Sequence, residues 1–585
     1  MTETEAAPGT TPEATEERAA GSGGGLVERY APFVAGAAIT APTLLAHYPP
    51  MSDLPLHEAV VGLLRHYGDE SYFPRELYTL NLGHANQLFH MLSWGLSYLV
   101  GTVWAVKIVI ATAQFLIFWM GARFADHLGR SRWGVLLLAP LALGFTYYWG
   151  LVANLLGFAA MLGVLPTIDN AAAKPSARKA AAVCALLVLV FFAHEAVFIA
   201  AIGLVGMLAI AYPYDRRKTP MRLVPVAFAV LFMAAHWVYQ QRFFTAGQVT
   251  PPMGFAPLWD KVYSIPNVLF GSHDMPAQLM LLGLSVTAAL ALAGGRVKAH
   301  REGQAAAGEV KTDGAEKVGR FRRLRAALLH YRFEITALGF LFLYFVMPFT
   351  WRGATLVYER FLGPAWALLV ICAAPRVAPR IAKLAAAVLP VAILLLSWPQ
   401  FVDSDSTTRN LDRIMEEIPL KSSVALVAID RPIYRTRVYS AAVGPARTVA
   451  TRGGRMALSL VISPLSPVQI RPEYRWDEFD IRTLLYGSRA LKPAHDLNRF
   501  GWIIAQSREP EVRDIMLEAM QPEAVHVMTQ GEWMLFRSTV PQVSMMSPDS
   551  PAPPHAQTIL DRVNRISNRR TGTPLPPPPP DGDPR

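Results

Sequence analysis

The chain has 585 residues, of which 52% are hydrophobic and 17% are charged. Ordinary soluble proteins carry about 25% charged residues, so this composition excludes a purely soluble protein and indicates a polytopic membrane protein. The formal net charge is +11, but the Arg and Lys residues lie between apolar runs rather than on one face. Basic residues beside membrane spans are retained in the cytoplasm, so this charge reports topology and requires no nucleic acid.

Residues 1–27 are rich in Thr, Glu, Ala and Gly and predict a disordered cytoplasmic tail. The apolar run 31–46 follows this acidic tail instead of the short basic segment of a signal peptide, which favours a first transmembrane helix. The later apolar runs that we expect to cross the membrane are 104–123, 133–148, 150–167, 180–195, 196–212, 222–240, 276–294, 333–350, 361–375 and 381–398. Together they predict about eleven transmembrane helices within residues 28–400.

The segment 84–100, HANQLFHMLSWGLSYLV, is ambiguous because it is apolar enough to span but begins with polar residues. If it lies along the membrane surface, the basic loops near 123–132, 174–179, 216–218 and 376–383 and the basic linker 295–330 all become cytoplasmic. If it spans instead, nearly every basic loop faces outward. The charge bias therefore predicts a cytoplasmic N-terminus and an outside C-terminus, with the loop 47–103 outside.

Residues 401–545 read as a soluble α/β domain outside the cytoplasm. The pattern predicts a helix at 408–417, strands at 424–429 and 502–506, a helix at 509–520, and a hairpin at 525–536 that turns at Gln530-Gly531. The Pro-rich segment 546–585 predicts a disordered tail. Cys184 and Cys372 both fall in apolar runs, so we expect neither a disulfide nor a metal–thiolate site.

The first outside loop places Asp53, His57 and Glu58 directly after the first span. A carboxylate near the membrane surface can accept a proton from an acceptor hydroxyl while a phosphate leaves, which makes Asp53 the candidate catalytic residue. His57 lies one helical turn from Asp53 and, with Glu58, is a candidate substrate-binding residue. The alternative is that Asp53 only caps the helix that continues through LHEAVVGLLRHY.

Three ionisable side chains, Arg352, Glu359 and Arg360, follow the predicted ninth span in FTWRGATLVYERFLGP. A guanidinium at the lipid interface can bind a phosphate with two hydrogen bonds, although all three residues could instead be interfacial anchors. His194 and Glu195 interrupt an apolar stretch, where they could face a ligand or mark the outer turn of a hairpin. We include all five, together with His84, among the candidate substrate-binding residues.

Several motifs are absent from the sequence, including P-loop, HExxH, GxSxG and CxxC patterns. In the C-terminal domain, Asp477, Glu478 and Asp480 lie between Arg475 and Arg482, where they could bind a cation or a sugar, or form a solvated loop. Trp476 and Trp533 could stack on a sugar or pack in a core. His236 reads as a core histidine within a span.

The order of these parts resembles the GT-C superfamily of membrane glycosyltransferases, which use polyprenyl-phosphate-linked sugars. The resemblance covers about residues 30–400. Its carriers are an early outside acidic residue (SDLPLHE), a surface-lying stretch (NLGHANQLFHMLSWGLSYLVG), a basic cytoplasmic loop (ARFADHLGRSR), the segment YYWGLVANLLGF and a late outside Arg (YERFLGPAWALL). In that family the early acidic residue is the proposed base, which maps onto Asp53, and late basic residues that hold the lipid phosphate map onto Arg352 or Arg360. The chain departs from the family pattern in having no DD, DE or DxD pair near Asp53 and no HPP after it.

The resemblance implies a glycosyltransferase of the bacterial-type inner membrane. It would move a sugar from a polyprenyl-phosphate donor to a glycan, lipid or protein acceptor on the outer face. We expect no cofactor, and a divalent cation has no support in the sequence. The alternatives are an envelope polysaccharide ligase or polymerase, a transporter or flippase, and a non-catalytic assembly or sensor protein.

Overall fold

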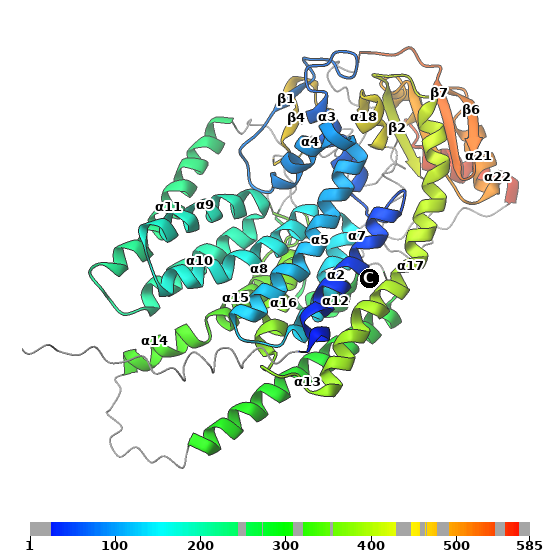
Figure 1. Ribbon diagram of the computed structural model, residues 1–585. Coiled ribbons are helices and arrows are strands. Elements are labelled where there is room, and N and C mark those ends of the chain that lie inside the picture. Colours follow the sequence, from blue (N-terminus) through cyan, green and yellow to red (C-terminus); the bar gives the residue numbers. More distant parts are fainter. Residues whose placement is uncertain are drawn as a thin grey trace, which may run out of the picture.

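The computed structural model describes residues 25–243, 253–271, 273–307, 320–351, 355–428, 446–456, 463, 465–476, 491–544 and 556–571. These residues form a bundle of helices with a small sheet at one end (Figure 1). The predicted fold class, a helical membrane domain with a small C-terminal α/β domain, is confirmed.

The predicted apolar runs form the long helices of the bundle, with one exception. These helices are α2 (Leu26–Leu45), α5 (Thr102–His127), α8 (Val152–Ala173), α9 (Ala177–Ala193), α10 (Glu195–Ala211), α11 (Lys218–Phe243), α13 (Met275–Ala307), α15 (Arg332–Val346), α16 (Leu362–Ala373) and α17 (Arg380–Glu416). Among the described residues, five helices (α5, α8, α11, α13 and α17) are long and apolar enough to cross a membrane, or six if α14 (Arg320–His330) and α15 form one bent span. The count of about eleven therefore stays a prediction.

The exception is the run 133–148, which we expected to be one continuous span. It is divided into η1 (Arg132–Leu138), α6 (Ala139–Ala142) and α7 (Phe145–Trp149), all packed inside the bundle. The chain breaks near Gly144, where an added Cβ would lie 2.2 Å from the carbonyl oxygens of Pro140 and Leu269. This close approach brings α12 (Leu258–Phe270) against the break, and hydrophobicity alone could not reveal it.

The ambiguous segment 84–100 contains a short helix, α4 (Leu88–Val100), of 13 residues. Its length is about 20 Å, less than the ~30 Å of a bilayer core, so it is too short to span. Phe89 and His90 are buried, whereas Tyr98 and Leu99 are 59% and 82% exposed. These two faces suit a helix that lies along the membrane surface, as the charge bias predicted.

The predicted cytoplasmic loops come together at the end of the bundle opposite α4 (Figure 1). The Ser131 amide donates to the Pro375 carbonyl at 2.8 Å, and Arg296 donates to the Cys372 carbonyl at 2.6 Å. Arg332, the first residue of α15, pairs with Asp169 near the end of α8 at 2.6 Å. The basic loops thus share one end of the molecule, as the predicted orientation requires.

The C-terminal sheet has five strands in the order β3-β2-β5-β7-β6. They are β2 (Ser423–Ala428), β3 (Arg455–Met456), β5 (Trp502–Gln506), β6 (Ala524–Gln530) and β7 (Trp533–Ser538). The hairpin β6–β7 turns at Gly531, whose φ of +59° favours glycine. The predicted strands, the hairpin and the helix α21 (Pro510–Ala519) are confirmed, whereas the helix expected at 408–417 is the end of the long helix α17.

The loop 47–103, which we predicted to lie outside, and the C-terminal domain form one body. From the loop come α3 (Leu54–Arg65) and β1 (Tyr78–Leu80), and β1 pairs antiparallel with β4 (Val468–Ile470). The Gly454 amide also donates to the Tyr72 carbonyl at 2.8 Å. One hydrophobic cluster contains side chains of α3, β1, α17, β2, β5 and β7. Because α17 runs without a break from the bundle into this body, it connects the two parts (Figure 1).

The segment 546–585, expected to be disordered throughout, contains the helix α22 (Ile559–Thr571). Ile559, Val563 and Ile566 are buried in the core beneath α21. Their spacing of four and three residues places them on one helical face. The expectation was wrong here because Arg and Asn residues between them lowered the local hydrophobicity.

Candidate functional site

Asp53 lies just before α3, in a connection held against the end of α7. The Ser52 amide donates to the Tyr148 carbonyl at 2.7 Å, and the Asp53 amide donates to the Trp149 carbonyl at 3.2 Å. Gly150, which follows Trp149, has a φ of +78°, and a Cβ added to it would lie 2.8 Å from the Asp53 nitrogen. The segment YYWG therefore fixes the backbone of Asp53, and glycine is required at its last position.

The Asp53 side chain makes no capping hydrogen bond, although the residue occupies the N-cap position of α3. The alternative in which Asp53 serves only as a cap is therefore wrong. Burial raises the pKa of Asp53 from 3.8 to about 7, and the positive charge of Arg360 opposes this increase. A carboxyl group whose pKa lies near neutral pH can both accept and release a proton, which suits a general base.

His57, in the first turn of α3, connects this helix to α4 and to Gly150. Its Nε2 lies 3.0 Å from the Gly150 carbonyl, and its Nδ1 lies 2.9 Å from Nε2 of His90 in α4. A carbonyl only accepts, so His57 Nε2 donates and His90 Nε2 donates to His57 Nδ1. Burial lowers the pKa of His57 to about 4 and that of His90 well below its usual value, so both rings are neutral. The pair thus connects α3, α4 and Gly150 without adding charge.

Arg360 is the positive centre of the site. It lies in η2 (Tyr358–Phe361), and its Nε and Nη2 each donate to a carbonyl, of Leu356 and Thr355 respectively, at 3.2 Å. Burial lowers the pKa of Arg360, while the negative charges of Glu195, Glu359 and Asp53 oppose that decrease. Burial also raises the pKa of Glu359 to about 7. The negative charges of three acidic side chains, from three separate parts of the chain, thus act on one guanidinium.

His194 and Glu195 form the turn between α9 and α10 beside this guanidinium. His194 Nε2 lies 2.9 Å from the side-chain oxygen of Asn154, and the Glu195 amide donates to the side-chain oxygen of Asn86 at 3.0 Å. Burial, and secondly the charge of Arg360, lower the pKa of His194 to about 3. These residues mark the outer turn of a hairpin, as one alternative predicted, and they also lie near Arg360.

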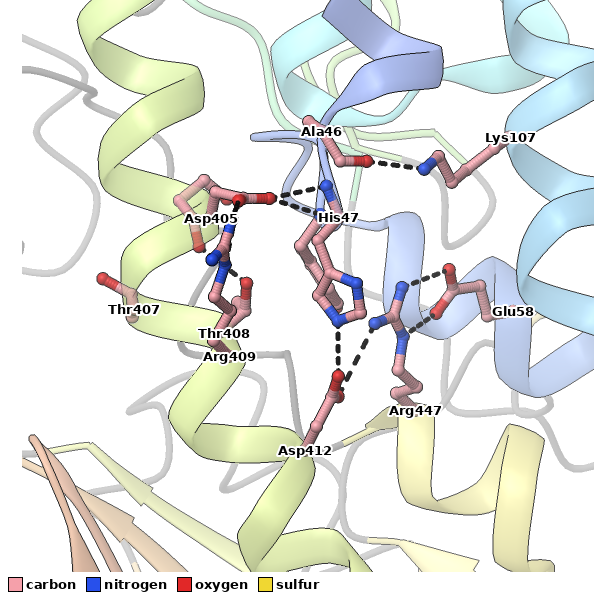
Figure 2. Close-up of polar contacts among 12 residues, drawn as sticks. Ala46, His47, Glu58, Lys107, Asp405, Thr407, Thr408, Arg409, Asp412 and Arg447 are labelled. Carbon is pink, nitrogen blue, oxygen red and sulfur yellow. Dashed lines mark hydrogen bonds and ion pairs between the residues drawn. The ribbon is translucent and has the colours of Figure 1, made fainter.

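The remaining predicted residues lie elsewhere. His84 contacts the Asn81 side chain at 2.8 Å and packs against His236 and Tyr239. Arg352 lies outside the described residues. Arg447 binds both carboxylate oxygens of Glu58 (Figure 2). Glu58 therefore has a different partner from His57, which contacts Gly150 and His90. Glu58 is thus committed to a protein contact, which differs from the substrate-binding role we expected.

The predicted groups of the C-terminal domain are partly described. Trp476 is buried over the guanidinium of Arg455, and Trp533 is buried with its Nε1 donating to the Thr407 carbonyl at 2.8 Å. Both are therefore core residues. Asp477, Glu478, Asp480 and Arg482 lie outside the described residues. Within the part of the chain that the structure describes, no group of three or more His, Cys, Asp or Glu residues could hold a metal ion.

A cavity of about 610 Å³ lies away from Asp53, where the loop after α3 faces the C-terminal domain. Glu70, Arg75 and Glu76 line one side, and Lys421 and Trp502 line the other. A hydrogen bond from Lys421 Nζ to the Glu70 carbonyl, at 2.9 Å, joins the two sides. The cavity belongs to the body formed by the loop 47–103 and the C-terminal domain, and not to the group around Arg360.

Several residues of the site could not be identified from the sequence. His90, Asn86 and Asn154 were visible as polar residues in apolar stretches, but nothing in the sequence indicated their partners. Gly150 follows the aromatic run that carried part of the family resemblance. Arg447 gave no signal, because its partner Glu58 lies 389 residues away.

Comparisons with known proteins bear on the fold. No family model matches the chain, and no curated protein matches it. Among solved structures, the chain is similar to the crystal structure of ArnT from Cupriavidus metallidurans bound to undecaprenyl phosphate, with a TM-score of 0.51 and 12% identity over 90% of this chain and 100% of that chain. ArnT is a GT-C glycosyltransferase that depends on a polyprenyl-phosphate-linked sugar. The chain therefore shares the fold of this ArnT structure, as the resemblance to the GT-C superfamily predicted.

Proposed function

We propose that the protein is a membrane glycosyltransferase that moves a sugar from a polyprenyl-phosphate donor to an acceptor hydroxyl on the outer face of the membrane. The observation that carries this proposal is Asp53, a carboxyl group with a pKa of about 7 under the influence of Arg360. The similarity to a structure that binds undecaprenyl phosphate supports a lipid-linked donor. We further propose an outside C-terminal domain and a location in the inner membrane.

In the proposed reaction Asp53 takes the proton of the acceptor hydroxyl as its oxygen attacks the anomeric carbon. The bond between that carbon and the phosphate oxygen breaks, and polyprenyl phosphate leaves with one additional negative charge. Arg360 stabilises this growing charge. A hydrogen-bond donor placed where negative charge develops in the transition state lowers the activation barrier. Attack opposite the leaving phosphate inverts the configuration at the anomeric carbon.

The other acidic groups have supporting roles in this proposal. Glu195 and Glu359 lie near Arg360 and oppose the effect of burial on its pKa, so they keep it charged before the donor binds. His194 is neutral and therefore does not compete with Arg360 for the phosphate. The reaction as proposed requires no metal ion.

The rival functions differ in the experiments that separate them. A polysaccharide ligase or polymerase would use the same donor and the same two residues, so analysis of the product identifies the acceptor. A transporter or flippase predicts ionisable residues deep in several spans. Against it, the charged residues of the group around Arg360 lie in η2, at the start of α10 and just before α3, and not in the middle of the long helices.

The test is Asp53→Asn, assayed for sugar transfer from a polyprenyl-phosphate sugar by purified protein in nanodiscs. We expect turnover to fall by at least about 1,000-fold, because removing the base leaves no group to accept the proton. Asp69→Asn is the matched control, since Asp69 is an exposed residue of the same loop that bonds only locally to Ser71 and His66. Full activity of Asp53→Asn would remove the catalytic assignment and favour the transporter and assembly alternatives.

A further inference from the structure

The ion pair between Glu58 and Arg447 joins parts of the chain that are far apart in sequence. Arg447 Nε donates to one carboxylate oxygen at 2.9 Å and Nη2 donates to the other at 3.1 Å. The side chains of Glu58 and Arg447 are only 0% and 3% exposed. A guanidinium that binds both oxygens fixes orientation as well as distance. The pair therefore holds α18 (Arg447–Arg452) against α3 in one relative position.

A second contact lies one turn further along both helices. Gly62 of α3 packs so closely on α18 that an added Cβ would lie 2.7 Å from Cα of Ala450. Glu58 and Gly62 are four residues apart on α3, and Arg447 and Ala450 are three apart on α18, so each pair shares a helix face. These two contacts, one turn apart along α3, determine both the rotation and the axial position of α3 relative to α18.

The segment that leads into Asp53 is held by the same group of residues (Figure 2). The amides of His47 and Tyr48 donate to Asp405 of α17 at 2.5 Å and 3.3 Å. The Tyr48 ring lies 4.1 Å from the Arg447 guanidinium, and Asp412 of α17 lies 3.8 Å from it. The His47 ring also contacts Asp412. Both the chain before Asp53 and the helix after it are thus attached to elements of the body formed by the loop 47–103 and the C-terminal domain.

We infer that Glu58 and Arg447 are positioning residues for Asp53, and that through them the C-terminal domain sets the rate of sugar transfer. The inference rests on the proposed function. His57 attaches α3 to Gly150, and Glu58 attaches it to Arg447. Asp53 directly precedes α3, so both attachments determine its position. A misplacement of about 1 Å at a reacting group can reduce a rate about 100-fold.

The effect of the pair on Asp53 is geometric and not electrostatic. The pKa of Asp53 is raised chiefly by burial and lowered by the charge of Arg360. A change at the pair therefore alters the pH dependence of turnover only if Asp53 moves out of its buried position.

The test is the double variant Glu58→Leu/Arg447→Met in the full-length protein in nanodiscs. Apolar replacement of both partners of a buried ion pair commonly preserves folding. We expect kcat to fall about 10- to 100-fold, the donor KM to stay within about two-fold, and the pH midpoint of turnover to fall, because a displaced Asp53 loses part of its burial. The single variant Arg447→Lys keeps the positive charge and one hydrogen bond to Glu58, so its kcat should lie between those of the double variant and the wild type.

The matched control is Glu523→Leu/Arg562→Met. This pair has the same two-point geometry, at 2.7 Å and 2.8 Å, but joins α22 to the loop before β6 and does not contact α3. We expect the control to keep the wild-type kcat and pH midpoint. If Glu58→Leu/Arg447→Met does not fold, Gly62→Ala is the second variant. It displaces α3 without removing a charge and should show the same loss of kcat.

The outcomes separate the two proposals. Wild-type kcat and pH midpoint in a folded Glu58→Leu/Arg447→Met or Gly62→Ala variant, or an equal loss in the control pair, would overturn the positioning role and leave the proposed function intact. Full activity of Asp53→Asn would overturn the proposed function itself.

Discussion

Turnover should depend steeply on pH between 5 and 8, because Asp53 must be ionised to accept a proton. With a pKa of about 7, about 1% of Asp53 is ionised at pH 5 and about 90% at pH 8. The rate should therefore fall about 100-fold from pH 8 to pH 5. An ordinary Asp, with a pKa of 3.8, would stay more than about 90% ionised over this range, and the rate would hardly change. The donor is a phosphodiester and keeps one charge throughout, so it contributes no pH dependence.

The assay is kcat/KM for sugar transfer in nanodiscs at half-unit pH intervals, with protein stability checked at each pH. Glu359 also has a pKa of about 7, so Glu359→Gln is measured in parallel and should keep the same midpoint. Arg360→Gln should raise the midpoint by about one unit, because the charge of Arg360 lowers the pKa of Asp53. A flat profile from pH 5 to 8, or a midpoint that disappears in Glu359→Gln, would refute the assignment of Asp53 as the base.

The remaining predictions concern stability and backbone geometry. Asp53→Asn should stabilise the protein at pH 8 by up to about 4 kcal/mol, because the pKa of Asp53 in the folded protein exceeds its unfolded value of 3.8 by about three units. This gain in stability should shrink as the pH falls from about 7 to 4. Chemical unfolding at pH 8 and pH 4 measures it. An equal gain at pH 4 and pH 8 would contradict this linkage. Gly150→Ala should lose activity at least about 10-fold, since a side chain there collides with the Asp53 backbone, whereas Gly206→Ala, with nothing within 4 Å, should be neutral in the same assay. Gly454→Ala should lower the melting temperature, because its Cβ would lie 1.8 Å from the Ser422 carbonyl oxygen; an unchanged melting temperature would show that this contact relaxes freely.

Much of the fold could be predicted because hydrophobicity and local patterns determine it. The apolar runs mark nearly every long helix, and the turn at Gly531 marks the hairpin β6–β7. The break in 133–148 could not be predicted, because it depends on the approach of α12 to Gly144. The pairing of β1 with β4 was also hidden, since two three-residue strands separated by almost 400 residues leave no local pattern.

The candidate site was predicted in part. Asp53, His194, Glu195, Glu359 and Arg360 stood out because ionisable residues beside apolar runs are costly, and the structure places them near one another. Glu58 has the same local appearance as Asp53, and only the position of Arg447 in space distinguishes it. A sequence shows which residues are unusual, whereas their partners depend on long-range packing.

The most direct test of the account is the position of the lipid phosphate in a cryo-EM structure of the protein in nanodiscs with polyprenyl phosphate. We expect phosphate density within hydrogen-bonding distance of the Arg360 guanidinium, with the Asp53 carboxyl group facing the same space. Phosphate bound at another part of the molecule, with Asp53 directed into the protein interior, would contradict it.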